Sequence, residues 1–199
     1  MRNISHWRWT FQIIHPGMTQ IIKGSSVMPY VEHVWGCELI EGEDKDGQPC
    51  ISEIGYTIDN TSKTRALFEI NKGVHSGDSR EGMSANTKIP EEFRRVHFIN
   101  MIYVADGPSD IPAFSVVNKN GGATFAIYPK GNERALKQVE QMRVEGRINM
   151  YAEADYTEGT MAYMWICNKI KEFADKIREE ERKKIAKYAE VKGPKHLVD

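Results

Sequence analysis

The sequence has 199 residues, of which 40% are hydrophobic and 28% charged, and its formal net charge at pH 7 is −1. This near-neutral balance argues against a dedicated nucleic-acid binder, and no apolar run approaches the roughly 20 residues that span a bilayer. We therefore expect one domain with a substantial core and with no nucleic-acid or membrane partner. The cysteines, at positions 37, 50 and 167, form no CxxC pair, which indicates reduced thiols and a cytoplasmic location.

The first third of the chain predicts a strand, a short helix and a hairpin. Residues 9–14 (WTFQII) are apolar and predict a buried strand, which His15-Pro16-Gly17 ends. Residues 18–23 then have helical spacing. Two β-prone runs, 31–39 (VEHVWGCEL) and 50–58 (CISEIGYTI), flank a polar turn, as in a β-hairpin.

The segment TSKTRALFEINKG, residues 61–73, predicts an amphipathic helix. Asn60 or Thr61 can cap its start, and Gly73 can end it. Its apolar face comprises Ala66, Leu67 and Ile70.

The polar stretch from residue 74 to about 97 has no clear periodicity. It is long for a loop in a compact domain, which favours either function or mobility. His75, Asp78 and Arg80 in this stretch could contact a substrate, or they could belong to a solvated loop.

After this stretch, strands alternate with helices along the chain. The expected strands are residues 99–105, 123–128 and 148–152, and the expected helices are 111–119, 133–144 and 160–187. This alternation implies right-handed crossovers and a mostly parallel sheet with helices on both faces. We therefore predict an open Rossmann-like α/β fold with an added hairpin. A single domain over residues 1–190 and a frayed tail over 191–199 are expected.

The turn in YVADGPSD, residues 103–110, carries candidate metal ligands. Asp106 follows an expected strand, and ligands gather at the carboxyl ends of strands in doubly wound sheets. Gly107 lets the backbone turn sharply or lets a ligand approach closely. Asp110 could point back toward Asp106, and two such carboxylates suit Mg²⁺. The alternative is that Asp106 is a turn residue and Asp110 an N-cap.

Lys63 is a candidate anion-binding residue because it lies near the start of the 61–73 helix. The partial positive charge of a helix N-terminus and an ammonium group together favour an anion. A phosphate held there, with Mg²⁺ on Asp106, would have its charge neutralised from both sides. The alternative is an exposed lysine in the first helical turn.

Four segments, IIHPGMTQIIKGS, TSKTRALFEINKG, MIYVADGPSDIPAF and ADYTEGT, carry a family resemblance. In this order they resemble the C-terminal two-thirds of a haloacid dehalogenase superfamily phosphatase of the phosphoserine phosphatase branch. The resemblance implies a small phosphorylated substrate, a Mg²⁺ cofactor bound by Asp106 with Asp110 as a further or supporting acid, and Lys63 as the catalytic stabiliser of phosphate and nucleophile. It also implies that His15 and Gly17 bind phosphate, although His15 has a strand-end role as its alternative.

The family's nucleophile motif, a hydrophobic strand ending in DxDx[TV], is not found in this sequence. The DxD at Asp44-Lys45-Asp46 follows acidic residues instead and predicts a hairpin turn. We therefore expect a phosphohydrolase domain that lacks the family's N-terminal strand and is inactive alone. A non-catalytic metal-binding, phosphate-binding or scaffold module, or a remnant without a site, are the alternatives. A missing central strand exposes two strand edges, which predicts a homo-oligomer or a complementing fragment.

Overall fold

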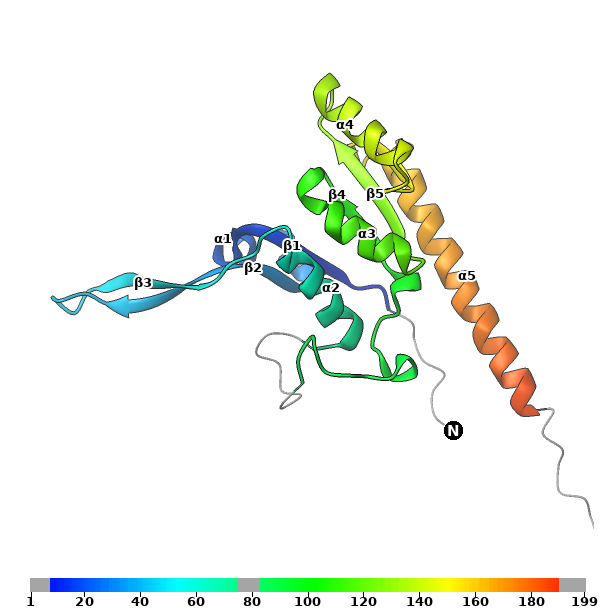
Figure 1. The fold of residues 1–199 in the computed structure, drawn as a ribbon, viewed down its shortest axis with the longest axis horizontal. Helices are drawn as coiled ribbons and strands as arrows, with labels where there is room; N and C mark the ends of the chain where they lie inside the picture. The colour runs from blue at the N-terminus through cyan, green and yellow to red at the C-terminus, as the bar shows by residue number, and fades with distance from the viewer. Residues whose placement is uncertain (1–7, 75–82, 190–199) are drawn as a thin grey trace, which may run out of the picture.

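The computed structural model of the protein describes residues 8–74 and 83–189, and it has an α/β fold (Figure 1). The strands are β1 (Phe11–Met18), β2 (Val31–Glu43), β3 (Pro49–Tyr56), β4 (Ile102–Ala105), β5 (Ala123–Tyr128) and β6 (Met150–Glu153). The α-helices are α1 (Thr19–Lys23), α2 (Ser62–Lys72), α3 (Ile111–Lys119), α4 (Glu133–Val144) and α5 (Met161–Ala189). Short 3₁₀ turns are η1 (Met28–Tyr30), η2 (Glu91–Phe93), η3 (Phe98–Asn100) and η4 (Pro108–Asp110).

Two parts of the sequence-based prediction fall outside these ranges. The loop residues His75, Asp78 and Arg80 and the tail at 191–199 are not among the described residues. Within the described ranges, none of the helices is long and apolar enough to cross a membrane.

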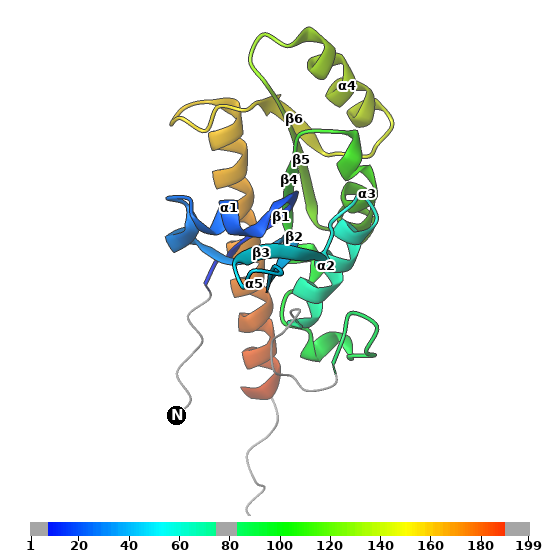
Figure 2. The same ribbon diagram turned by 90° about the vertical axis from the view of Figure 1, so that its left-hand side faces the viewer.

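Strands β4, β5 and β6 form a parallel sheet in that order, as the alternation of strands and helices predicts. Side chains of β5 alternate between two clusters: Ala126 lies in the larger cluster, while Phe125 lies in a smaller one with residues of α5. Helices α3 and α4 accordingly cover one face of this sheet and α5 the other (Figures 1 and 2). The predicted bounds of α3, β5 and α4 are confirmed, whereas β4 begins later than expected because η3 takes up residues 98–100.

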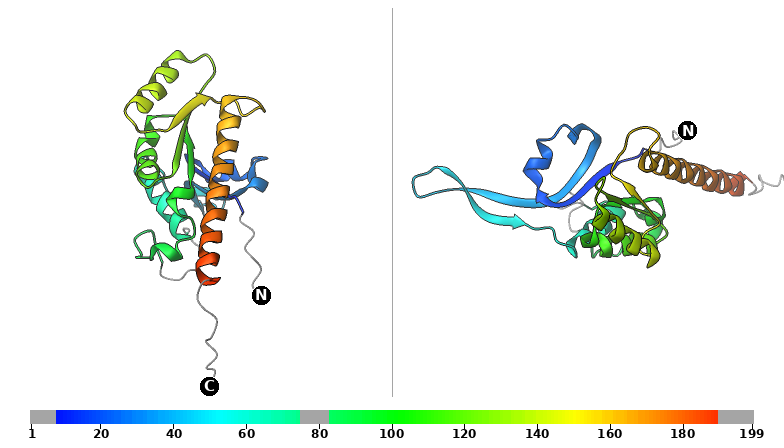
Figure 3. Two further views of the ribbon diagram at one scale, coloured as in Figure 1. Left: turned by 90° about the vertical axis from the view of Figure 1, so that its right-hand side faces the viewer. Right: turned by 90° about the horizontal axis from the view of Figure 1, so that it is seen from above.

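Strand β2 has two partners along its length. Residues 31–37 pair with β1 in parallel, and residues 38–43 pair with β3 in an antiparallel ladder. The predicted hairpin is therefore confirmed, and it projects far from the body of the molecule (Figure 3). At its tip the Asp44 Oδ1 atom accepts hydrogen bonds from the main-chain N–H groups of Asp46 and Gln48, which confirms the predicted turn role of this DxD.

Helix α2 has the predicted apolar face but a different cap. Ala66, Leu67 and Ile70 are buried, and Gly73 ends the helix in the left-handed conformation with φ of 70°. The cap is Asp59, whose Oδ1 accepts hydrogen bonds from the N–H groups of Thr61, at 2.9 Å, and Ser62, at 2.7 Å. Thr61 occupies the predicted N-cap position, but its side chain makes no cap hydrogen bond, and Asp59 supplies that bond instead.

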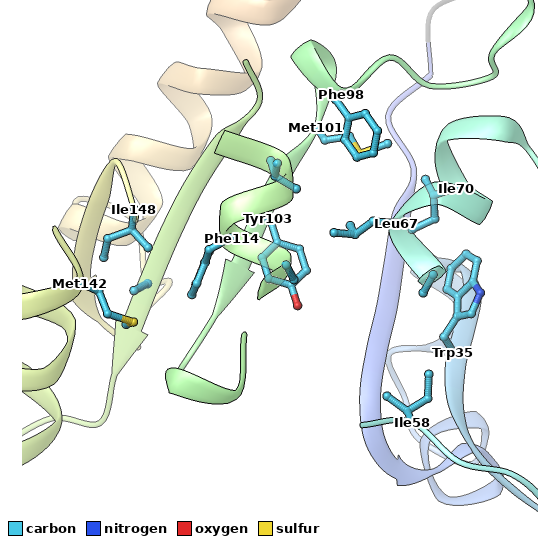
Figure 4. Packing of buried hydrophobic residues seen from close by; sticks show 14 of the residues in the cluster. Trp35, Ile58, Leu67, Ile70, Phe98, Met101, Tyr103, Phe114, Met142 and Ile148 are labelled. Carbon is cyan, nitrogen blue, oxygen red and sulfur yellow. The ribbon is translucent and has the colours of Figure 1, made fainter. Parts of the chain in front are cut away.

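The expected single sheet is divided into two. Strands β1 and β4 each end a three-stranded sheet, and among the described residues no strand joins them. One hydrophobic cluster nevertheless includes side chains from both halves. Figure 4 shows Trp35 and Leu67 on one side of it, and Tyr103 and Phe114 on the other. The two sheets therefore share a core without sharing a hydrogen-bond ladder.

Candidate functional site

Lys63 of α2 and Asp110, at the end of η4, form a buried ion pair. The Lys63 Nζ atom lies 2.8 Å from the Asp110 Oδ1 atom, and the two side chains are only 6% and 4% exposed. An ammonium and a carboxylate are buried together because each offsets the desolvation of the other. The alternative of an exposed first-turn lysine is therefore wrong. Two motifs 47 residues apart meet at one point.

Two further donors bind the carboxylate of Asp110. The hydroxyl of Tyr103 donates to its Oδ1 atom at 2.6 Å, and the hydroxyl of Ser109 donates to Oδ2 at 3.0 Å. Although Asp110 stands at the N-cap position of α3, its side chain makes no cap hydrogen bond. Oδ1 therefore accepts from both Lys63 and Tyr103, and Oδ2 accepts from Ser109, so the carboxylate of Asp110 orients Lys63.

Tyr103 is a member of this cluster that the sequence analysis missed. Burial, the hydrogen bond to Asp110 and the nearby carboxylates of Asp110 and Asp106 raise the pKa of its phenol far above the ordinary value of 10.0. The phenol therefore stays protonated and keeps donating to Asp110. Its ring packs edge-to-face on Phe114, with the ring centroids 5.3 Å apart. A tyrosine in a buried strand needs a partner for its hydroxyl, and that rule is the signal that could have identified it.

Asp106 differs from Asp110 because its side chain is exposed. It follows β4 directly, at the carboxyl end of the strand, and makes no hydrogen bond or ion pair with any described residue. The expectation that Gly107 provides the sharp turn was wrong: its φ of −167° is extended backbone, and η4 makes the turn. Gly107 is buried, yet a Cβ there would meet nothing within 4 Å, so this position has room for a side chain.

His15 and Gly17 lie in a bulge of β1, where Ile14 pairs with Trp35 and Met18 with Cys37. The Gly17 N–H donates to the Nδ1 atom of His15 at 2.8 Å. Since Nδ1 accepts this bond, the neutral imidazole carries its proton on Nε2 and can donate it outward. The Gly17 N–H is engaged within the chain, and neither residue contacts the Lys63 ion pair. Their phosphate-binding roles remain predictions.

The residues at this end of β4 do not by themselves provide a full set of metal ligands. Among the described residues, no group of three or more His, Cys, Asp or Glu side chains could hold a metal ion. Magnesium, however, commonly takes one or two protein carboxylates together with water and phosphate oxygens. The exposed carboxylate of Asp106 fits one such ligand, while Asp110 is already bound to Lys63. Other oxygen ligands would have to come from solvent, a phosphate or another polypeptide.

Comparison with known proteins gives one relative of interest. A protein of Borreliella burgdorferi, described as uncharacterized, is 37% identical over 171 residues, which cover 79% of this chain and 56% of that protein. The chain thus spans about half the length of this relative. No family model matches the chain, and no solved structure matches it.

Proposed function

We propose that the chain is a phosphohydrolase domain of the haloacid dehalogenase type, which binds a phosphomonoester and Mg²⁺ but lacks its own nucleophile. The observation that carries this proposal is the buried Lys63–Asp110 ion pair beside the exposed Asp106 at the carboxyl end of β4. The sequence resemblance assigns phosphate and Mg²⁺ binding to these same three residues. Their proximity supports a shared site.

Each residue has a distinct role in this proposal. The ammonium of Lys63 binds phosphate oxygens, and Asp110 holds that ammonium in place through its 2.8 Å contact. Tyr103 and Ser109 fix the carboxylate of Asp110 by their hydrogen bonds. Asp106 would hold Mg²⁺, which supplies charge neutralisation on the phosphate. His15 can add one hydrogen bond from Nε2.

A non-catalytic phosphate- and metal-binding module is the second candidate function. It is favoured by the position of Asp44 and Asp46 in an exposed turn at the tip of the hairpin, where no core strand precedes them. A nucleophilic carboxylate must lie within reach of the phosphate, and these two aspartates lie at the hairpin tip instead of following β4. In this reading the site binds ligands but does not cleave them.

Hydrolysis of an aryl phosphate with Mg²⁺ or with EDTA, followed by calorimetric titration with inorganic phosphate and Mg²⁺, tests both candidates. The variants are Asp106→Asn and Lys63→Met, and Asp175→Asn on the exposed face of α5 is the matched control. Binding without turnover, lost in both variants but not in the control, supports a phosphate- and Mg²⁺-binding site that lacks its nucleophile. Mg²⁺-dependent turnover that Asp106→Asn abolishes would instead show that the chain contains a nucleophile, and it would exclude the non-catalytic module. Absence of both turnover and binding overturns the proposal.

We also propose a cytoplasmic location for the protein. Cys37, Cys50 and Cys167 are all free thiols in the structure, which agrees with a reducing compartment. Fractionation of cells that make the protein tests this, and recovery outside the cytoplasmic fraction would contradict it.

A further inference from the structure

The helix layer of the molecule is continuous at the place where its sheet layer is interrupted. Helix α2 packs against β1, α3 packs against β4, and the two helices pack against each other. The hydrophobic cluster beneath them includes Leu67 of α2 and Phe114 of α3. Strands β1 and β4, however, are the last strands of their respective sheets. The discontinuity therefore lies between β1 and β4, under an intact pair of helices.

The width of this discontinuity follows from packing geometry. The axes of two packed helices lie about 8–10 Å apart. Neighbouring strands lie about 4.8 Å apart, so two strands separated by one missing strand lie roughly 9.5 Å apart. Since α2 covers β1 and α3 covers β4, the helix spacing leaves room for one strand between them.

We infer that a short extended segment of a separate polypeptide binds between β1 and β4 and joins the two sheets into one. One face of this segment would lie under α2 and α3. The other face would lie toward α5, whose Phe173 stacks on Trp9 just before β1 with ring centroids 6.5 Å apart. A strand covered on both faces reads as a continuous apolar run, so we expect an apolar segment at least as long as the four residues of β4.

A separate polypeptide fits this place better than a second copy of the chain. Every described strand already belongs to a sheet, and the projecting hairpin is two strands wide, so neither offers one free strand. The Borreliella burgdorferi relative extends beyond the matched part, which covers only 56% of it. Its remaining sequence supplies a concrete polypeptide with which to test the inference. The inference depends on sheet geometry alone and goes beyond the phosphate chemistry.

Hydrogen–deuterium exchange tests this inference with the full chain. The probe is the part of the Borreliella burgdorferi relative that lies outside the match, produced as a separate polypeptide. We expect a one-to-one complex in which the main-chain amides of residues 11–14 and of residues 102–105 both exchange at least tenfold more slowly. Phe11→Lys, at an exposed position of β1, should weaken binding at least tenfold. Phe93→Lys, at a somewhat more exposed position on η2, is the matched control.

The outcomes that overturn the inference are distinct. A probe that does not bind, or that protects only one of the two strands, excludes insertion between them. A dimer of the chain alone, measured by light scattering, with both strands protected would identify a second copy as the occupant. Slow exchange in α4 and α5 of each variant shows that it is folded. None of these readouts depends on phosphate hydrolysis, so the phosphohydrolase proposal can fail independently.

Discussion

Replacement of Lys63 by methionine tests whether the buried ion pair organises the site. Methionine keeps most of the length of the side chain and removes the ammonium, so Asp110 is left as a buried carboxylate without a counter-charge. Breaking a buried ion pair in this way costs about 3–5 kcal/mol. Because Tyr103 and Ser109 still donate to Asp110, we expect the lower end of this range, about 3 kcal/mol.

A double-mutant cycle with Asp110→Asn isolates the interaction between the two charges. Residues in direct contact show coupling energies of about 0.5–3 kcal/mol, and for this buried pair we expect about 2 kcal/mol or more. The double variant should therefore be more stable than the sum of the single effects predicts. Urea unfolding followed by tryptophan fluorescence at pH 7 measures all four stabilities, since Trp35 and Trp165 lie in the core.

The exposed ion pair between Lys183 and Glu179 provides the matched control. Its Nζ–Oε1 distance is 3.2 Å, but the side chains are 72% and 64% exposed. Such surface pairs contribute about 0.5 kcal/mol or less, so Lys183→Met should be nearly neutral. A Lys63→Met variant within 0.5 kcal/mol of Lys183→Met would refute the reasoning, because Lys63 would then not be neutralising a buried charge.

Three further predictions address the surroundings of the site. With Tyr103 present, the free energy of unfolding should fall above pH 10 by up to about 1.4 kcal/mol per pH unit, since only the unfolded phenol ionises there. Tyr103→Phe should abolish this decrease, and urea unfolding from pH 9 to 11 measures it. Gly73→Ala should cost about 1–2 kcal/mol in thermal unfolding, because φ is 70° and the new Cβ lies 2.9 Å from that of Arg95. Asp59→Ala should lower the melting temperature at pH 7, and this deficit should shrink as the pH falls below the ordinary carboxyl range, because hydrogen bonds from Ser62 lower the pKa of Asp59 and the stability they add is lost as the pH falls through that lowered pKa. An unchanged pH profile for Tyr103→Phe, an unchanged melting temperature for Gly73→Ala, or a deficit for Asp59→Ala that does not vary with pH would contradict the respective prediction.

The sequence predicted the elements of the second half well. Helices α3 and α4 and strand β5 have the expected bounds because their apolar periodicity is regular and turn residues flank them. The meeting of the 61–73 helix and the acid turn was also predictable, since the start of a helix and the carboxyl end of a strand gather at one edge of an α/β sheet. Lys63 contacts the acid turn through a direct ion pair with Asp110, which the sequence analysis did not predict.

Other features depend on tertiary context that a single sequence does not reveal. In the sequence, Tyr103 is one of several apolar residues of a predicted strand, and only the fold shows that its hydroxyl reaches Asp110. The cap at Asp59 was missed because several residues near the helix start are good caps. The Gly17 N–H has an internal partner, His15, whose contact arises from a local bulge. The division of the sheet was foreseen only as unpaired edges, because strand order is a long-range property.

Strand β2 connects the projecting hairpin directly to the ladder with β1. Its residues 38–43 form one side of the projecting hairpin, and its residues 31–37 are bonded to β1 without an intervening loop (Figure 3). A displacement of the hairpin is thus transmitted along one continuous backbone to Cys37, which donates a hydrogen bond to the carbonyl of Pro16. Pro16 lies within the His15–Gly17 bulge, so this bulge is the part of β1 that a side-chain hydrogen bond joins to β2 just before the hairpin begins.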